Sequence, residues 1–385
     1  MNLKETRIGR NLKNRAGGVG LVISAGLMAA AGSACLKDNL INTPTPIIRT
    51  VPTVEPTIQL IPTPTLESKQ KIAVPTPESP KAQWDKLPAL ERLKRLRANN
   101  SNLEGFDRQD EDTRAVVEFF CQNVMCSIPP DEIIENHFVY VDSTNISQKL
   151  KERGFDLTDS QISQEEESMS FVIQKPPPDN PNTTIFINSD VIGREAKRAV
   201  EEQPKLGEIP NFEAYLTQKT KFISLGYLNI PNEELALNEP FHYGDYYIYK
   251  FIGFRVGAKD EKGDEVKLPG IRIAMAELLA QKISTKSGFK LVNTTYKDGV
   301  ELLSQLVSAA GISDQEFMEY TDGQRSISEF VERIGSLKKN ESYDSQSVGA
   351  NAIIEVGFVT SGTKDKIAGK KYLESILILQ PTYER

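Results

Sequence analysis

Hydrophobic residues recur at helical spacing in some segments of this chain and gather in short runs in others. Leu87, Leu90, Leu93 and Leu96 lie three residues apart, which predicts a first helix over 84–97. Short runs rich in β-branched and aromatic residues predict strands. These strands cover residues 138–141, 169–174, 183–188, 246–256 and 265–268. The turn residues at 176–181 and 260–263 then predict two hairpins.

The other periodic segments predict helices, and most of them follow Gly270. The predicted helices are 112–125, 143–153, 190–202, 212–225, 273–285, 296–310, 314–320, 326–337 and 364–379. One further apolar run, 351–358, predicts a last strand. Strands first and helices later are typical of an α+β fold. We therefore expect a small sheet of hairpins in the first half, packed on a mainly helical second half.

The N-terminal segment, residues 1–34, has the order of an export signal. Five basic residues and one acid precede an uncharged segment, Ala16–Ala34, that is just long enough to span a bilayer. The ending Gly32-Ser33-Ala34-Cys35 resembles the lipobox of bacterial lipoproteins, which implies cleavage before Cys35 and lipidation of its thiol. Gly32 departs from that pattern, because a large aliphatic residue is usual there. An uncleaved membrane anchor and simple secretion stay open as alternatives.

A Thr/Pro-rich stretch follows, and nine of the 22 prolines of the chain lie between Thr43 and Pro80. Proline at this density prevents a helix or a central strand, so the stretch is expected to be an extended tether, reaching on the order of 100 Å. The sequence thus predicts a signal peptide or membrane anchor over 1–34, a linker over 35–83 and a globular domain over 84–385. All three versions of the leader place that domain outside the cytoplasm, and the lipidated and anchored versions place it on the extracytoplasmic face of the membrane.

Charge and composition restrict the classes of partner that the globular domain is expected to bind. The chain has 39% hydrophobic and 26% charged residues, as soluble domains do, and a net charge of -7. The five bases and one acid of segment 1–34 give it +4, which leaves -11 for the rest. An acidic body is a poor binder of nucleic acid, and we read the basic run Arg92–Arg97 as a solvated helix face. The expected partners are the membrane, through the N-terminal segment, and a peptide or protein.

The three cysteines are Cys35, Cys121 and Cys126. With Cys35 lipidated, the other two are left to form a disulfide in an oxidising compartment or to stay as two buried thiols. They lie five positions apart, so a bridge requires the helix to end between them. A metal site is not expected here, because the sequence has no second cysteine pair and no histidine nearby.

Known catalytic motifs are absent from the sequence. It contains no His-Glu-x-x-His, no Gly-x-Ser-x-Gly, no phosphate-binding loop and no dinucleotide fingerprint. His137 and His242 are the two histidines, and neither lies in a ligand or triad pattern. The sequence therefore favours a protein that is not an enzyme.

The layout of residues 183–337 nevertheless has a precedent. The strand Thr184–Asn188, a helix, a strand pair and the helix Ile271–Ser284 follow one another, with later helices at 296–303 and 312–317. This order resembles that of bacterial zinc metallopeptidases of the gluzincin type. In that family the first helix carries His-Glu-x-x-His and the second supplies a glutamate as the third zinc ligand.

The resemblance places Thr217, Gln218 and Lys221 where the family has its first histidine, its glutamate and its second histidine. A second register, Phe212–Leu216, keeps only the glutamate. The third-ligand position falls on Ile273, and Glu277 matches a non-ligand position. The expected site is therefore a degenerate cleft lined by these five residues (Thr217, Gln218, Lys221, Ile273 and Glu277), with no metal, no cofactor and no catalytic residue.

Three functions follow from this sequence. The first is a tethered binding or scaffold module built on an inactive metallopeptidase-like domain. The second is an active hydrolase whose metal donors come from His137, His242 and a carboxylate, which requires the two histidines to converge. The third is a structural envelope lipoprotein, which predicts no concave pocket with converging polar groups.

Overall fold

The computed structural model describes residues 79–98, 107–155, 157–158, 162–163, 165–174, 183–268, 270–286, 296–338 and 344–377. The leader, Cys35 and most of the predicted linker lie outside these residues. Of the described residues, those from Leu87 onward belong to one compact unit, and residues 79–86 belong to another. No helix among the described residues is both long and apolar enough to cross a membrane.

The predicted helix over 84–97 is two helices. α1 (Pro80–Asp85) begins after Ser79, whose hydroxyl accepts a hydrogen bond from the backbone of Ala82 at 3.2 Å. α2 (Ala89–Ala98) begins immediately after Pro88. Proline disfavours helical backbone in the residue before it and lacks the N–H that a continuous helix needs, so the leucine spacing alone was misleading.

The first half of the body is built from helices and a three-stranded sheet. Its elements are α3 (Arg108–Cys121), α4 (Pro130–Glu132), the π-helix η1 (Ile133–His137), β1 (Phe138–Val141), α5 (Ile146–Glu152), β2 (Ser170–Gln174), β3 (Thr183–Asn188), α7 (Ser189–Glu202), the 3-10 helix η2 (Pro204–Glu208) and α8 (Phe212–Asn229). The strand order is β1-β3-β2, and β3 is parallel to β1 and antiparallel to β2. Every residue of β3 is buried, as its central position requires.

Aromatic packing fills one face of this sheet. Phe171 and Phe186, opposite each other on β2 and β3, stack with ring centroids 4.7 Å apart. Phe155 meets Phe186 edge-on at 6.0 Å. Such contacts contribute about 0.5–1.5 kcal/mol beyond the burial of the rings. The contact of Phe155 holds the segment after α5 against the sheet.

A second, four-stranded sheet follows α8. Its strands are β4 (Glu234–Tyr243), β5 (Tyr246–Ile252), β6 (Arg255–Lys259) and β7 (Glu265–Leu268), antiparallel in the order β4-β5-β6-β7. The predicted single strand over 246–256 breaks at Gly253 and Phe254, whose φ angles are 52° and 64°. These left-handed residues turn the chain back, so β5 and β6 pair with each other, and the predicted turn at 260–263 joins β6 to β7. β4 was not predicted, because most of its residues are exposed.

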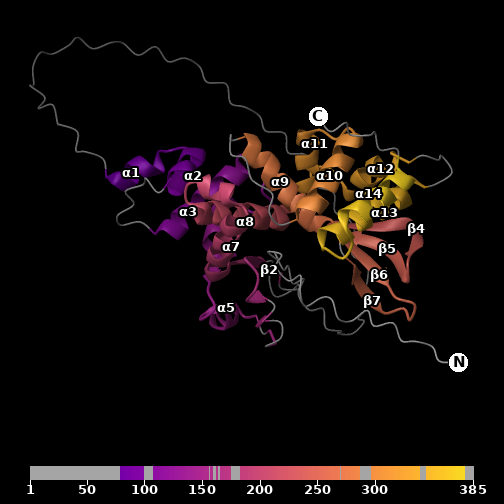
Figure 1. Cartoon of the computed structure of the whole chain (residues 1–385), viewed down its shortest axis with the longest axis horizontal. Coiled ribbons are helices and arrows are strands. Elements are labelled where there is room, and N and C mark those ends of the chain that lie inside the picture. The colour runs from indigo at the N-terminus through magenta and orange to yellow at the C-terminus, as the bar shows by residue number, and fades with distance from the viewer. Residues whose placement is uncertain are drawn as a thin grey trace, which may run out of the picture. The chain divides into compact units, whose positions relative to one another are not determined.

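Helices complete the second half. They are α9 (Arg272–Lys286), α10 (Lys297–Ala309), α11 (Asp314–Thr321), α12 (Ile327–Gly335), α13 (Ser345–Thr360) and α14 (Lys366–Ile376). Figure 1 shows β4 to β7 beside α13 and α14, whereas β2 lies near α7 and α8. The fold is α+β, with small sheets in the first half and mostly helices in the second, as predicted.

The predicted last strand over 351–358 is wrong, because this segment is the middle of α13. Ala352, Ile353, Ile354 and Val356 are all buried, so the helix is apolar around most of its circumference. A continuous apolar run carries no period that separates a buried helix from a buried strand.

Candidate functional site

α8 carries three of the residues in the predicted cleft, and it lies inside the body. Asn211 precedes the helix, and its side chain accepts a hydrogen bond from the backbone of Ala214 at 3.3 Å. From Tyr215 to Asn229 only Thr217 and Leu228 keep appreciable exposure. A helix buried on all sides has no solvated face for charged side chains, so each of its lysines needs a partner in the core.

Asp112 on α3 is the partner of Gln218 and Lys221. The Gln218 amide donates to Asp112 Oδ1 at 2.6 Å, and the Lys221 ammonium donates to Asp112 Oδ2. Gln218 and Lys221 are each 0% exposed. Two residues that the resemblance places at the zinc helix are therefore bound to one carboxylate inside the core. Thr217, by contrast, is half-buried and donates to the Glu213 carbonyl of its own helix at 3.0 Å.

Tyr140 on β1 completes the surroundings of Lys221. The ammonium lies 5.1 Å from the centre of the Tyr140 ring, whose hydroxyl shares a 2.5 Å hydrogen bond with Thr113. Burial lowers the pKa of Lys221, but Asp112 and Tyr140 outweigh burial and raise that pKa above its ordinary value. Burial also raises the pKa of Tyr140. Lys221 is thus a fixed cation in the core.

Lys219 on the neighbouring face of α8 pairs with Glu277 on α9. Their charged atoms are 3.3 Å apart, and the side chains are 1% and 0% exposed. Burial lowers the pKa of Lys219, and Glu277 opposes this effect. Next to this pair the helices touch, since a Cβ at Gly226 would lie 3.1 Å from the Ala276 carbonyl oxygen. α8 and α9 are in direct contact there.

The five predicted residues do not line an open cleft. Gln218, Lys221 and Glu277 have no exposed surface, and only Thr217 and Ile273 are partly exposed. Gln218 and Lys221 bond to α3, whereas Lys219 is the residue of α8 that pairs with α9. Among the described residues, no hydrogen bond or ion pair joins the positions expected for the zinc ligands. Ligand atoms would have to converge on one point to hold a metal.

The histidines also lie apart from each other in the fold. His137 is 1% exposed at the end of η1, where Nδ1 contacts the Thr183 carbonyl beside the three-stranded sheet. His242 is exposed on β4 of the other sheet, with its ring centre 5.5 Å from that of Tyr247. The described residues contain no group of three His, Cys, Asp or Glu side chains placed to hold a metal ion. The metal ligands that the hydrolase alternative requires are therefore not brought together among the described residues.

Arg272, at the start of α9, is a buried junction that the sequence analysis missed. One end of its guanidinium donates to the carbonyls of Tyr227 at 2.8 Å and Ile230 at 2.5 Å, at the C-terminal end of α8. The other end donates to Asn232 at 3.0 Å and to the Gly253 carbonyl at 3.2 Å. Burial lowers the pKa of Arg272. No sequence signal marks it, because most of its acceptors are backbone carbonyls of other segments.

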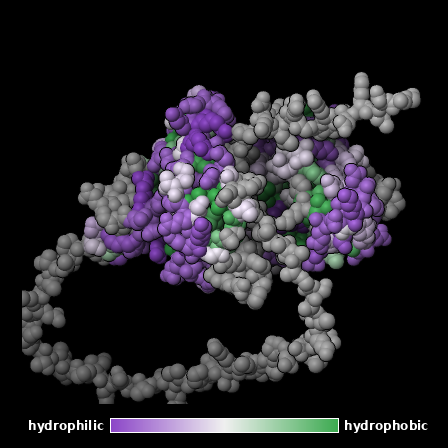
Figure 2. Space-filling model, turned by 90° about the horizontal axis from the view of Figure 1, so that it is seen from below, coloured by the Kyte–Doolittle hydropathy of each residue, from purple (hydrophilic) through white to green (hydrophobic). Residues whose placement is uncertain are grey.

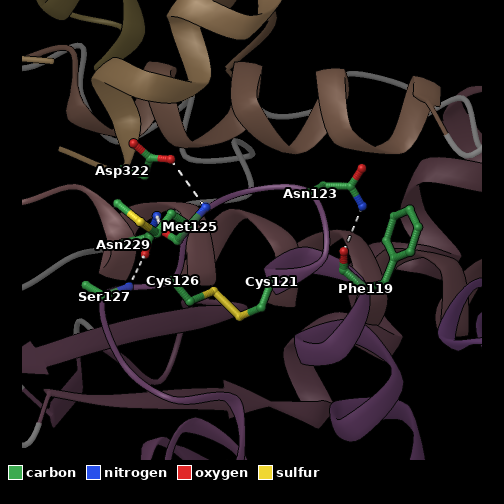
Figure 3. The surroundings of a disulfide bond; sticks show 8 residues. All are labelled: Phe119, Cys121, Asn123, Met125, Cys126, Ser127, Asn229 and Asp322. Atoms are coloured by element: carbon green, nitrogen blue, oxygen red, sulfur yellow. Dashed lines mark hydrogen bonds between the residues drawn. A yellow bond between two sulfur atoms is a disulfide. The ribbon is translucent and has the colours of Figure 1, made fainter. Parts of the chain in front are cut away.

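The structure joins Cys121 and Cys126 in a disulfide with a Cα–Cα distance of 5.4 Å. α3 ends at Cys121, so the helix terminates before the second cysteine, as a bridge requires. The segment closed by the bridge is hydrogen-bonded to Asn229 and to Asp322 (Figure 3). Of the two alternatives for these thiols, the structure has the bridged form.

Two features of the surface of the described residues bear on ligand binding. Figure 2 shows a face that is mostly hydrophilic, with hydrophobic colour gathered in small areas. A hollow beside the disulfide is lined mainly by apolar side chains and has no room for a water molecule. Its lining includes Phe120, Ile128, Ile133, Leu225 and Leu228. No family model, curated protein or solved structure matches this chain.

Proposed function

We propose that this protein is a non-catalytic binding or scaffold module, held on the extracytoplasmic face of a membrane by its N-terminal segment. The observation that carries the proposal is the buried set Lys221, Gln218 and Asp112. A protonated lysine repels a metal cation, and it already holds the carboxylate that a metal would need. We infer that these three buried polar side chains stabilise the packing of α8 on α3 and do not bind a metal.

The cysteines support the extracytoplasmic part of the proposal. Disulfides persist mainly in oxidising compartments, and the described body contains one between Cys121 and Cys126. The basic, apolar and small-residue order of the leader agrees with export. Cys35 in a lipobox-like sequence would attach the chain to the membrane through a lipid.

Metal content and peptide cleavage test the non-catalytic part. We expect the full-length protein, purified in detergent, to carry no stoichiometric zinc and to leave a mixed peptide library uncut. Stoichiometric zinc together with cleavage that a chelator abolishes would overturn the proposal. Incorporation of labelled fatty acid into the wild type but not into Cys35→Ala tests the anchor, and equal labelling of both would refute lipidation at Cys35.

A purely structural envelope protein is the second candidate. It is favoured by the hollow beside the disulfide, which is too small for a ligand and has no converging charged groups. Photo-crosslinking in cells separates the two candidates. Probes placed at the exposed apolar positions Met125, Tyr247 and Ile367 should give discrete adducts if the domain binds a partner. Absence of adducts at all three positions would favour the structural role.

A further inference from the structure

The segment that the disulfide closes is bound on two sides by distant parts of the body. We call residues 121–127 the disulfide segment. The backbone N–H of Met125 donates to Asp322 Oδ2 at 3.3 Å, in the turn that follows α11. The Asn229 amide donates to the Met125 carbonyl at 3.1 Å and accepts from the Ser127 N–H at 3.0 Å. Both partners come from elements far along the chain from the segment.

Both the nitrogen and the oxygen of the Asn229 amide form hydrogen bonds to the backbone of this segment. It is the last residue of α8 and is 5% exposed, so both of its bonds are made in a largely dry environment. Losing them would leave a buried amide without partners, which costs more than an exposed hydrogen bond contributes. The position of the segment therefore matters to the end of α8, next to the carbonyls that Arg272 holds.

The bridge holds the segment in the shape that makes these bonds. Val124 is buried, whereas Met125 is 56% exposed, so apolar burial anchors only part of it. Asn123 folds back to the Phe119 carbonyl at 2.8 Å and fastens the end of α3 (Figure 3). Both cysteines are only half-buried, as exchange with a thiolate from solution requires.

We propose that the Cys121–Cys126 disulfide is a redox latch that fixes the disulfide segment against Asn229 and Asp322 and releases it on reduction. A protein dithiol attacks one sulfur, passes through a mixed disulfide and leaves as a disulfide itself. The Cys121–Cys126 bond accepts two electrons and two protons, and both residues become thiols. The released segment also uncovers the hollow that it walls together with Phe120 and Leu225.

Hydrogen exchange of the full-length protein in detergent, with dithiothreitol as the dithiol, tests the latch. Reduction should speed exchange of the Met125 and Ser127 amides at least about tenfold, which corresponds to ~1.4 kcal/mol. The last turn of α8 should follow, and β5 and β6 should not change. Fluorescence of an apolar dye should rise as the hollow opens. The double variant Cys121→Ser, Cys126→Ser should reproduce these changes without reductant.

Asn229→Leu is the matched variant, because it removes the amide bonds and keeps the bridge. It should speed exchange at Ser127 in the oxidised protein, whereas the Asn123 side of the segment stays protected. Unchanged protection of the Met125 and Ser127 amides after reduction would overturn the latch. Loss of protection throughout the body would also overturn it, since the bridge would then be a general structural crosslink.

Discussion

Lys221 and Gln218 bind the two oxygens of one carboxylate, that of Asp112, across the contact between α8 and α3. The arrangement places a charged group in the core and satisfies it there. The free-energy cost of replacing one member depends on which charge is then left buried without a partner.

Replacing Asp112 should therefore destabilise the body more than replacing Lys221. Asp112→Asn leaves Lys221 as a fully buried cation without its counter-charge, which costs about 3–5 kcal/mol. Lys221→Met leaves a carboxylate that is 11% exposed and still bonded to Gln218, so we expect a loss of only about 1–3 kcal/mol. Urea unfolding followed by circular dichroism measures both. The double variant should be more stable than the sum of the single losses predicts, and strict additivity would show that the pair is not coupled.

The pair Lys219 and Glu277 should be replaceable as a unit. Lys219→Met alone leaves the Glu277 carboxylate fully buried without its counter-charge. This should lower the free energy of unfolding by about 3–5 kcal/mol. Lys219→Met with Glu277→Leu fills similar volume without charge and should be neutral or stabilising by up to about 4 kcal/mol. Thermal unfolding measures the two variants. A double variant less stable than Lys219→Met would contradict the view that the pair serves packing.

Two glycines should respond in opposite ways to alanine. A Cβ at Gly349 on α13 would overlap the Val331 carbonyl oxygen on α12, so Gly349→Ala has to push the helices apart. We expect a loss of about 1–3 kcal/mol or more. The nearest atoms to a Cβ at Gly193 on α7 are 3.8 Å away, so Gly193→Ala should add about 0.5–1 kcal/mol. Denaturant unfolding compares them, and equal effects would refute the close helix crossing.

Acid should remove the contribution of Glu316 at the start of α11. The Ser313 backbone N–H and Arg333 bond to this carboxylate and lower its pKa from 4.5 to about 2. A lowered pKa in the folded state means a contribution that is complete above pH 4.5 and lost as the pH falls through 2. The melting temperatures of wild type and Glu316→Gln should thus differ at pH 6 and converge toward pH 2. A difference that stays constant over this range would contradict the assignment.

Local sequence patterns predicted much of this fold. The strands β1, β2 and β3 lie where short apolar runs predicted them, and α9 to α12 follow the periodic segments. Those patterns work because each element presents one recognisable face to the core. The predictions failed at α13, whose apolar residues surround the helix, and at β4, whose residues are mostly exposed. The sequence of α13 has no polar face that would mark a helix, and β4 has no continuous apolar run that would mark a buried strand.

The candidate site was predicted less well than the fold. The lysines of α8 were located correctly on a helix, but nothing in their spacing indicates that Lys219 and Lys221 have different partners on different neighbouring helices. Their partners are Glu277, much later in the chain on α9, and Asp112, much earlier on α3. A single sequence contains no information on which distant segments meet.

By itself, the sequence determined the α+β class and the spacing that lets Cys121 and Cys126 meet. Both are set by neighbouring residues, through periodicity or the reach of a short loop. Only the tertiary structure decided that α13 is a helix, that α8 is buried on all sides and that its lysines are paired. The physical reason is that burial and ion pairing depend on what packs against a segment, and here the packing partners come from distant parts of the chain.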